Sequence, residues 1–129
     1  MTWLLSRSLM ESTLADIAQV KKLCDENGIK LVIWTNPLHH LTYEDALNRN
    51  YLGFLEQLAQ ITDYYNFSGL NEITTSNDNF VDPSHFRAEI GDIMIDVMWN
   101  GAFYEDLYEQ GFGWYVTKDN VHELLDVLK

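Results

Sequence analysis

The spacing of apolar residues near the start of the chain predicts a long amphipathic helix. A capping box, Ser8-Leu9-Met10-Glu11, marks its beginning, and Asn27-Gly28 offers an easily formed left-handed C-cap at its end. Between these signals, apolar residues recur in steps of three and four, which places them on one helical face. They are Met10, Leu14, Ile17, Val20 and Cys24. We therefore expect the first element to be a helix with one buried face.

Two later runs have the composition of buried strands. Residues 29–35 are β-branched and nearly all apolar, as in a parallel strand that is covered on both faces. Pro37 ends this run because proline lacks the amide donor that a sheet requires. Residues 62–67 predict a second strand, closed by Ser68-Gly69, and residues 113–117 predict a short strand or extended arm.

Helices are expected between and after these strands. Thr42-Tyr43-Glu44-Asp45 is a second capping box, and a third helix is expected to start around Asp82-Pro83 and to end at Asn100-Gly101. A short helical turn over residues 103–108 and a final helix with Val121, Leu124, Leu125 and Leu128 complete the pattern. The expected buried face of the second helix consists of Leu47, Tyr51, Phe54, Leu55 and Leu58.

The order helix, strand, helix, strand is that of a wound α/β fold. We expect residues 1–129 to form a single domain of three layers, α/β/α, around a short parallel sheet. Such a sheet normally has about four to six strands, and a run as apolar as residues 31–34 should have paired neighbours. The sequence therefore predicts a partial domain. The polar loop at residues 70–81 follows the second strand, at the edge where α/β sheets bind ligands.

The charge balance narrows the range of partners. The 129 residues include 20 acidic and 8 basic ones, for a net charge of -12, so nucleic acids and anionic membrane surfaces are disfavoured. No apolar run approaches the roughly 20 residues of a membrane-spanning helix, and no secretory signal is visible. Cys24, the only cysteine, excludes an internal disulfide and lies on a helical apolar stripe as a small core residue. A cytoplasmic location is expected for this chain.

The chemistry of greatest interest lies in Asp82-Pro83-Ser84-His85-Phe86. A histidine takes up a proton near pH 7, and an aspartate can fix its tautomer, so the two make up two thirds of a nucleophilic triad. A purely structural interpretation also exists. In it, Asp82 is an N-cap, Pro83 occupies the first helical position, and His85 is an ordinary polar residue of the first turn.

This block, placed after a strand that ends Tyr65-Asn66-Phe67-Ser68, resembles the final sequence block of the SGNH hydrolase (GDSL esterase) superfamily. It is most similar to bacterial SGNH-like proteins with a D-P-[ST]-H-[FY] sequence, some of them linked to acyl modification of cell-surface polysaccharides. The resemblance covers residues 28–101 and implies an SGNH or flavodoxin-like fold. It implies that Asp82 orients His85, and that His85 activates a serine that attacks an ester carbonyl to form an acyl-enzyme. The substrate would be a small-molecule or carbohydrate acyl ester.

The family's nucleophile sits in a Gly-Asp-Ser block, and this chain has none. Ser6 and Ser8 lack the preceding strand and the glycine, whereas Ser68 and Ser84 are in the wrong places. We therefore expect the C-terminal portion of such a hydrolase, inactive as an isolated chain, whose nucleophile would come from an N-terminal partner chain or from a missing part of the gene. The alternative is a non-catalytic interaction module that covers its open sheet edge as a homo-oligomer.

Three further residues follow the first predicted strand at its carboxyl end. Asn36, His39 and His40 are expected to approach the same cleft and to contact substrate. Either histidine with Asp82 and His85 would satisfy the ligand chemistry of zinc or iron, so a metal-dependent hydrolase is a second alternative. The spacing matches no metal motif, and we predict no metal and no cofactor.

Overall fold

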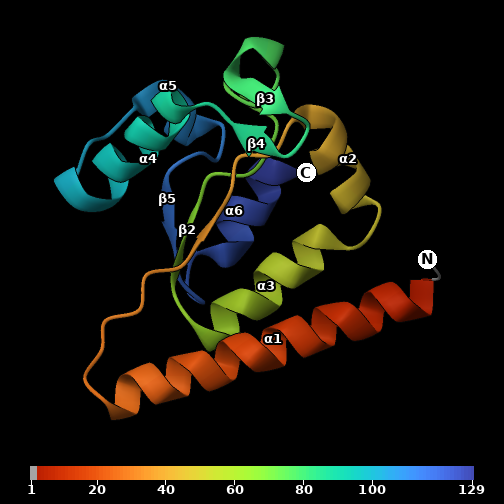
Figure 1. The fold of residues 1–129 in the computed structure, drawn as a ribbon, viewed down its shortest axis with the longest axis vertical. Helices are drawn as coiled ribbons and strands as arrows, with labels where there is room; N and C mark the ends of the chain where they lie inside the picture. The colour runs from red at the N-terminus through yellow and green to blue at the C-terminus, as the bar shows by residue number, and fades with distance from the viewer. Residues whose placement is uncertain (1–2) are drawn as a thin grey trace.

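A computed structural model describes the backbone of residues 3–129 and the side chains from residue 9 onward. The described residues form a mixed α/β structure (Figure 1). The helices are α1 (Trp3–Glu26), α2 (His40–Leu47), α3 (Tyr51–Ile61), α4 (Ala88–Asn100), α5 (Glu105–Glu109) and α6 (Val121–Leu128), with a 3-10 turn η1 (Asn77–Asn79). The strands are β1 (Trp34–Thr35), β2 (Tyr64–Asn66), β3 (Phe80–Asp82), β4 (His85–Phe86) and β5 (Trp114–Val116).

The main sheet has the strand order β1-β2-β5. Strands β1 and β2 are parallel, with Trp34 opposite Tyr65, as the two apolar runs predicted. Strand β5 pairs antiparallel with β2 and places Tyr115 opposite Tyr65, so the sheet is mixed rather than parallel. Strands β3 and β4 form a separate antiparallel hairpin.

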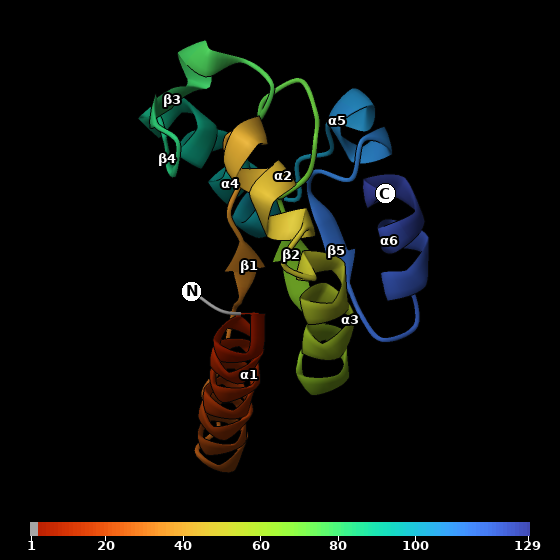
Figure 2. The ribbon, with the colours of Figure 1, turned by 90° about the vertical axis from the view of Figure 1, so that its right-hand side faces the viewer.

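Helices cover both faces of the main sheet. Tyr64 and Tyr65 are neighbours on β2 and point to opposite faces, where they join different apolar clusters. Figure 2 shows the corresponding arrangement, with α6 and α4 on opposite sides of β2 and β5. The larger cluster includes Leu14, Leu55, Leu58, Val116, Val121 and Leu124, and the smaller one includes Phe67, Ile73, Ile90, Met94 and Phe112.

The first helix is present but begins at Trp3, five residues before the capping box Ser8-Leu9-Met10-Glu11, so the prediction of its start is wrong, and Val20 of its expected buried face is exposed. Helix α1 ends one residue before Asn27-Gly28, and the final helix and the strand at residues 113–117 are both present as α6 and β5. The described part of the chain has no helix whose length and hydrophobicity would let it cross a lipid bilayer.

The strand expected over residues 29–35 is much shorter. Only Trp34 and Thr35 form strand β1, and this strand pairs on one side, with β2. One more hydrogen bond extends the pairing, because the carbonyl of Ile33 accepts from the amide of Tyr65. The prediction that this run is covered on both faces is therefore wrong for the described structure: Leu31, Val32 and Ile33 are only half-buried.

The single helix expected after Thr42 is two helices. Asn50 adopts a left-handed backbone, with φ of 64°, and this conformation separates α2 from α3. Helix α2 also begins earlier than its capping box, because the ring of His39 accepts the amide of Leu41 as an N-cap. Thr42 lies inside α2 instead of capping it.

Asp82-Pro83 does not begin a helix. Asp82 ends β3 and pairs with His85 of β4 across a two-residue turn, whereas α4 begins at Ala88. The amide of Arg87 donates to the carbonyl of Asn79 at 2.8 Å and closes the base of the hairpin. The interpretation of Asp82 as a helix N-cap is therefore wrong, and the motif occupies a β-turn.

Candidate active site

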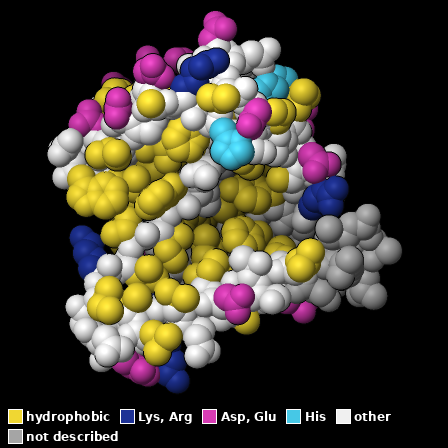
Figure 3. Space-filling view, viewed as in Figure 1, with side chains coloured by type: hydrophobic (Ala, Val, Ile, Leu, Met, Phe, Trp, Pro, Cys, Tyr) yellow, Lys and Arg dark blue, Asp and Glu magenta, His cyan; other side chains and the backbone are white. Residues whose placement is uncertain are grey.

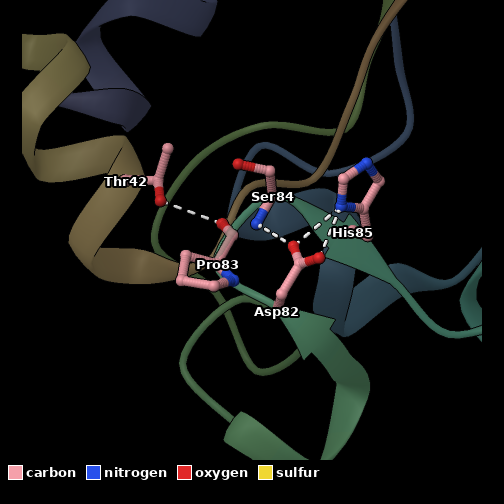
Figure 4. A network of polar contacts seen from close by, with 5 residues as sticks. All are labelled: Thr42, Asp82, Pro83, Ser84 and His85. Atoms are coloured by element: carbon pink, nitrogen blue, oxygen red, sulfur yellow. Dashed lines mark hydrogen bonds and ion pairs between the residues drawn. The ribbon is translucent and has the colours of Figure 1, made fainter.

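The β3–β4 hairpin brings Asp82 and His85 into direct contact. Nδ1 of His85 lies 2.7 Å from one carboxylate oxygen of Asp82 and 2.8 Å from the other (Figure 4). A carboxylate can only accept, so Nδ1 carries the proton and Nε2 of the neutral ring is left as the acceptor. No other described residue bonds to the His85 ring, and Nε2 is thus open to receive a proton from an incoming hydroxyl.

The turn itself holds the carboxylate in place. The amide of Ser84 donates to Asp82 at 2.9 Å, and the hydroxyl of Thr42 in α2 donates to the carbonyl of Pro83 at 2.9 Å. The bond from Ser84, and after it the bond from His85, hold the pKa of Asp82 below its ordinary value. Asp82 is therefore ionised at neutral pH, which is the state that orients an imidazole.

This pair lies at the surface of the described chain. The side chain of His85 is 75% exposed and that of Asp82 is 48% exposed. In a Ser-His-Asp triad the aspartate is buried and the site excludes water. The hairpin therefore supplies the geometry of a catalytic pair without the enclosure that such a pair requires.

An apolar groove of about 640 Å³ begins beside the pair, at Phe86. Its walls come from β1, from the residue that follows β1 and from α4, and they include Trp34, Asn36, Met94, Ile95 and Trp99. Figure 3 shows hydrophobic side chains across the hollowed centre of this face. Asn36 is the one expected substrate-contacting residue that lines the groove, and its side-chain oxygen accepts the indole N–H of Trp34 at 3.0 Å.

His39 and His40 are engaged elsewhere. Nδ1 of His39 accepts the amide of Leu41, and Nε2 donates to Asn77 at 2.6 Å, so both ring nitrogens are used. The ring stacks on His40 at 4.3 Å and meets Phe80 edge-on at 5.5 Å. These contacts give His39 a structural role at the start of α2, and none of them reaches Asp82 or His85.

Neither Ser68 nor Ser84 has the position of a nucleophile. Ser68 is fully buried, and its hydroxyl donates to Asn66 at 2.6 Å while it accepts from Tyr51 at 2.8 Å. Ser84 lies within the turn, between the members of the pair. The side chains of Ser6 and Ser8 lie outside the described residues.

A buried polar network at the carboxyl ends of β1 and β2 was missed from the sequence. The side-chain oxygen of Asn66 accepts from Thr35 at 2.7 Å and from Ser68, and its amide donates to the carbonyls of Ser68 and Gly111 at 3.0 and 2.9 Å. The available signal was the position of Asn66 two residues after Tyr64, on a face that is otherwise apolar. This network ties both parallel strands to the loop before β5.

Comparison with known proteins finds no matching family model, no matching curated protein and no matching solved structure. The interpretation of the site therefore depends on its residues and geometry.

Proposed function

We propose that this chain is the C-terminal part of an SGNH-like serine esterase or acyl hydrolase. In this proposal Asp82 and His85 form the acid-base pair, and a separate polypeptide segment supplies the nucleophilic serine and the oxyanion donors. The substrate is an acyl ester of a small molecule or of a carbohydrate. The observation that carries the proposal is the contact of both Asp82 carboxylate oxygens with Nδ1 of His85.

The proposed chemistry uses this contact in each step. Nε2 of His85 takes the serine proton while the serine oxygen bonds to the ester carbonyl carbon. The protonated ring then gives that proton to the departing alcohol, which leaves an acyl-enzyme. Water, deprotonated by the same nitrogen, releases the acid and restores the serine. Asp82 remains ionised throughout and stabilises the imidazolium.

The arrangement of helices on both faces of the sheet supports an SGNH-like three-layer domain, of which this chain would form a portion. The parallel β1–β2 pair also supports the proposal, because open α/β sheets bind ligands at the carboxyl ends of their parallel strands. The antiparallel β5 differs from the fully parallel sheet that the sequence led us to expect.

The test compares two histidine variants in the presence of the missing half. The DNA upstream of Met1 is read for a frame that encodes Gly-Asp-Ser, and its product is combined with this chain and a fluorophosphonate probe. We expect serine labelling and turnover of p-nitrophenyl acetate, both lost in His85→Gln. His122→Gln is the matched control, because His122 also lies at the surface beside a carboxylate, 3.7 Å from Glu56.

Labelling that persists in His85→Gln would refute the role of His85. Serine labelling of the isolated chain would show that the nucleophile is already present. A promoter immediately upstream of Met1, with no such frame, would favour a different function.

That second candidate function is a non-catalytic interaction module. The exposed indoles of Trp34 and Trp99 beside an edge strand favour it, because monomers rarely expose contiguous apolar patches. A metal-dependent hydrolase has less support. Within the described residues, no three His, Cys, Asp or Glu side chains form a group that suits a metal ion.

A further inference from the structure

The outer edge of β1 is unpaired in the described structure. Strand β1 is the last strand of the sheet, and Figure 2 shows no other strand beside it. The carbonyls of Ile33 and Thr35 accept bonds from β2. Because successive residues of a strand direct their backbone groups to opposite sides, the amide and carbonyl of Trp34 face away from β2, and the same alternation continued back through Ile33 gives Val32 this orientation. These groups are a template for one more strand.

Apolar surface is exposed beside this edge in the groove under α4, and α1 exposes apolar side chains as well. On one face, α4 extends over the groove with Ile95 and Trp99, and Trp99 is 60% exposed. On the other face, α1 buries one stripe against α3 and exposes a second apolar stripe. That second stripe consists of Leu9, Val20 and Leu23.

We infer that β1 binds an extended strand of another polypeptide, which pairs with Val32 and Trp34 and fills the groove under α4. A strand added at the normal spacing of about 4.8 Å places alternate side chains against the groove and against the α1 side. The inference rests on the proposed function in one respect, the direction of the strand. A strand parallel to β1 would have its C-terminal end beside Asn36 and Phe86. The residue that follows this strand would then approach His85.

The charge of the chain argues for a different polypeptide rather than a second copy. Two copies would bring together formal charges of -12 each, whereas the groove residues themselves are uncharged. A fatty acid would fill the groove but leave the edge amides without partners. A neutral or basic strand with apolar side chains would fill the groove, pair with the edge of β1 and avoid repulsion by the acidic chain.

The experiment uses a peptide of about ten residues that alternates valine and lysine, at high salt to screen simple charge attraction. Hydrogen exchange is followed residue by residue. We expect the peptide to slow exchange at the amides of Val32 and Trp34 by at least roughly tenfold, whereas the same peptide with N-methylated amides has no effect. Slow exchange at Tyr65 and Phe67, which donate to β1, reports that each variant is folded.

Two charge-matched variants test the groove. Trp99→Glu should abolish the protection, and Phe103→Glu should retain it, because Phe103 is similarly exposed but does not line the groove. Failure of the peptide to protect Val32 and Trp34 would overturn the inference, as would equal protection by the N-methylated peptide. Protection of these amides in a concentration-dependent dimer of the chain alone would replace the inferred partner with a second copy. None of these readouts requires catalysis, so the inference and the proposed function can fail separately.

Discussion

Replacing Asn66 with alanine tests whether the buried network holds the carboxyl ends of β1 and β2 together. The substitution removes four hydrogen bonds at a fully buried position. The carbonyls of Ser68 and Gly111 lose their amide donor, and the hydroxyls of Thr35 and Ser68 lose a shared acceptor. A buried polar group left without a partner costs about 1–3 kcal/mol, and the hydroxyls can partly re-pair with each other. We therefore expect a loss of about 3–5 kcal/mol in the free energy of unfolding.

Urea unfolding followed by tryptophan fluorescence measures this change. A single domain is typically stable by about 5–15 kcal/mol, so the midpoint should fall markedly while the slope stays the same. Asn100→Ala is the control. Asn100 is exposed and its side chain bonds only to Asp96 within its own helix, so the expected change is within about 0.5 kcal/mol. A loss below about 1 kcal/mol for Asn66→Ala would refute the proposed role of the network.

Two further predictions concern the hairpin. In His85→Ala, the pKa of Asp82 should rise but remain below its ordinary value, because the Ser84 amide is the larger cause of its depression; carboxyl NMR titration measures this. Since this pKa is depressed on folding, its contribution to stability is present above pH 3.8 and lost as the pH falls through the folded-state value. Thr42→Val should accelerate amide exchange in the hairpin and cost at most about 1.5 kcal/mol, because it removes the bond to Pro83.

The controls for these two predictions lie elsewhere in the chain. His122→Ala should leave the titration of Asp82 unchanged. Thr13→Val removes a hydroxyl bond to the carbonyl of Leu9 within α1, and hairpin exchange should stay as it is. Full recovery of the ordinary Asp82 value in His85→Ala would contradict the order of the two causes, and unchanged exchange in Thr42→Val would contradict the anchoring of the turn.

The end of the first helix and the presence of the last one could be predicted from local periodicity and a stop signal, whereas the capping box at Ser8 misplaced the start of the first helix. The break between α2 and α3 could not, because both helices bury residues against neighbouring parts of one core and the apolar spacing runs through the gap. Asn50 held the only local signal, since asparagine tolerates a left-handed backbone better than most residues. The length of β1 could not be predicted either, because strand pairing depends on neighbours that are distant in sequence, and among the described strands β1 pairs only with β2.

The contact between the side chains of Asp82 and His85 was predicted correctly, but the motif was placed in a helix and lies in a hairpin. Aspartate before proline favours a helix start, and it equally favours a tight turn, because the first turn residue has nearly helical backbone angles. The residues after the turn decide between the two, and here Phe86 pairs back onto Phe80 instead of continuing a helix. The exposure of the pair depends on chain packing at long range and has no signal in the motif.

The turn that holds Asp82 and His85 also determines how the pair depends on the rest of the molecule. Every bond to the Asp82 carboxylate comes from a residue no more than three positions away. The orientation of the imidazole is therefore determined within a four-residue segment and does not need the serine, the substrate or any partner to be present. If the proposed function is right, this half of the reaction centre has its hydrogen-bond geometry before assembly, and the counterpart would have to supply the enclosure that the exposed pair lacks.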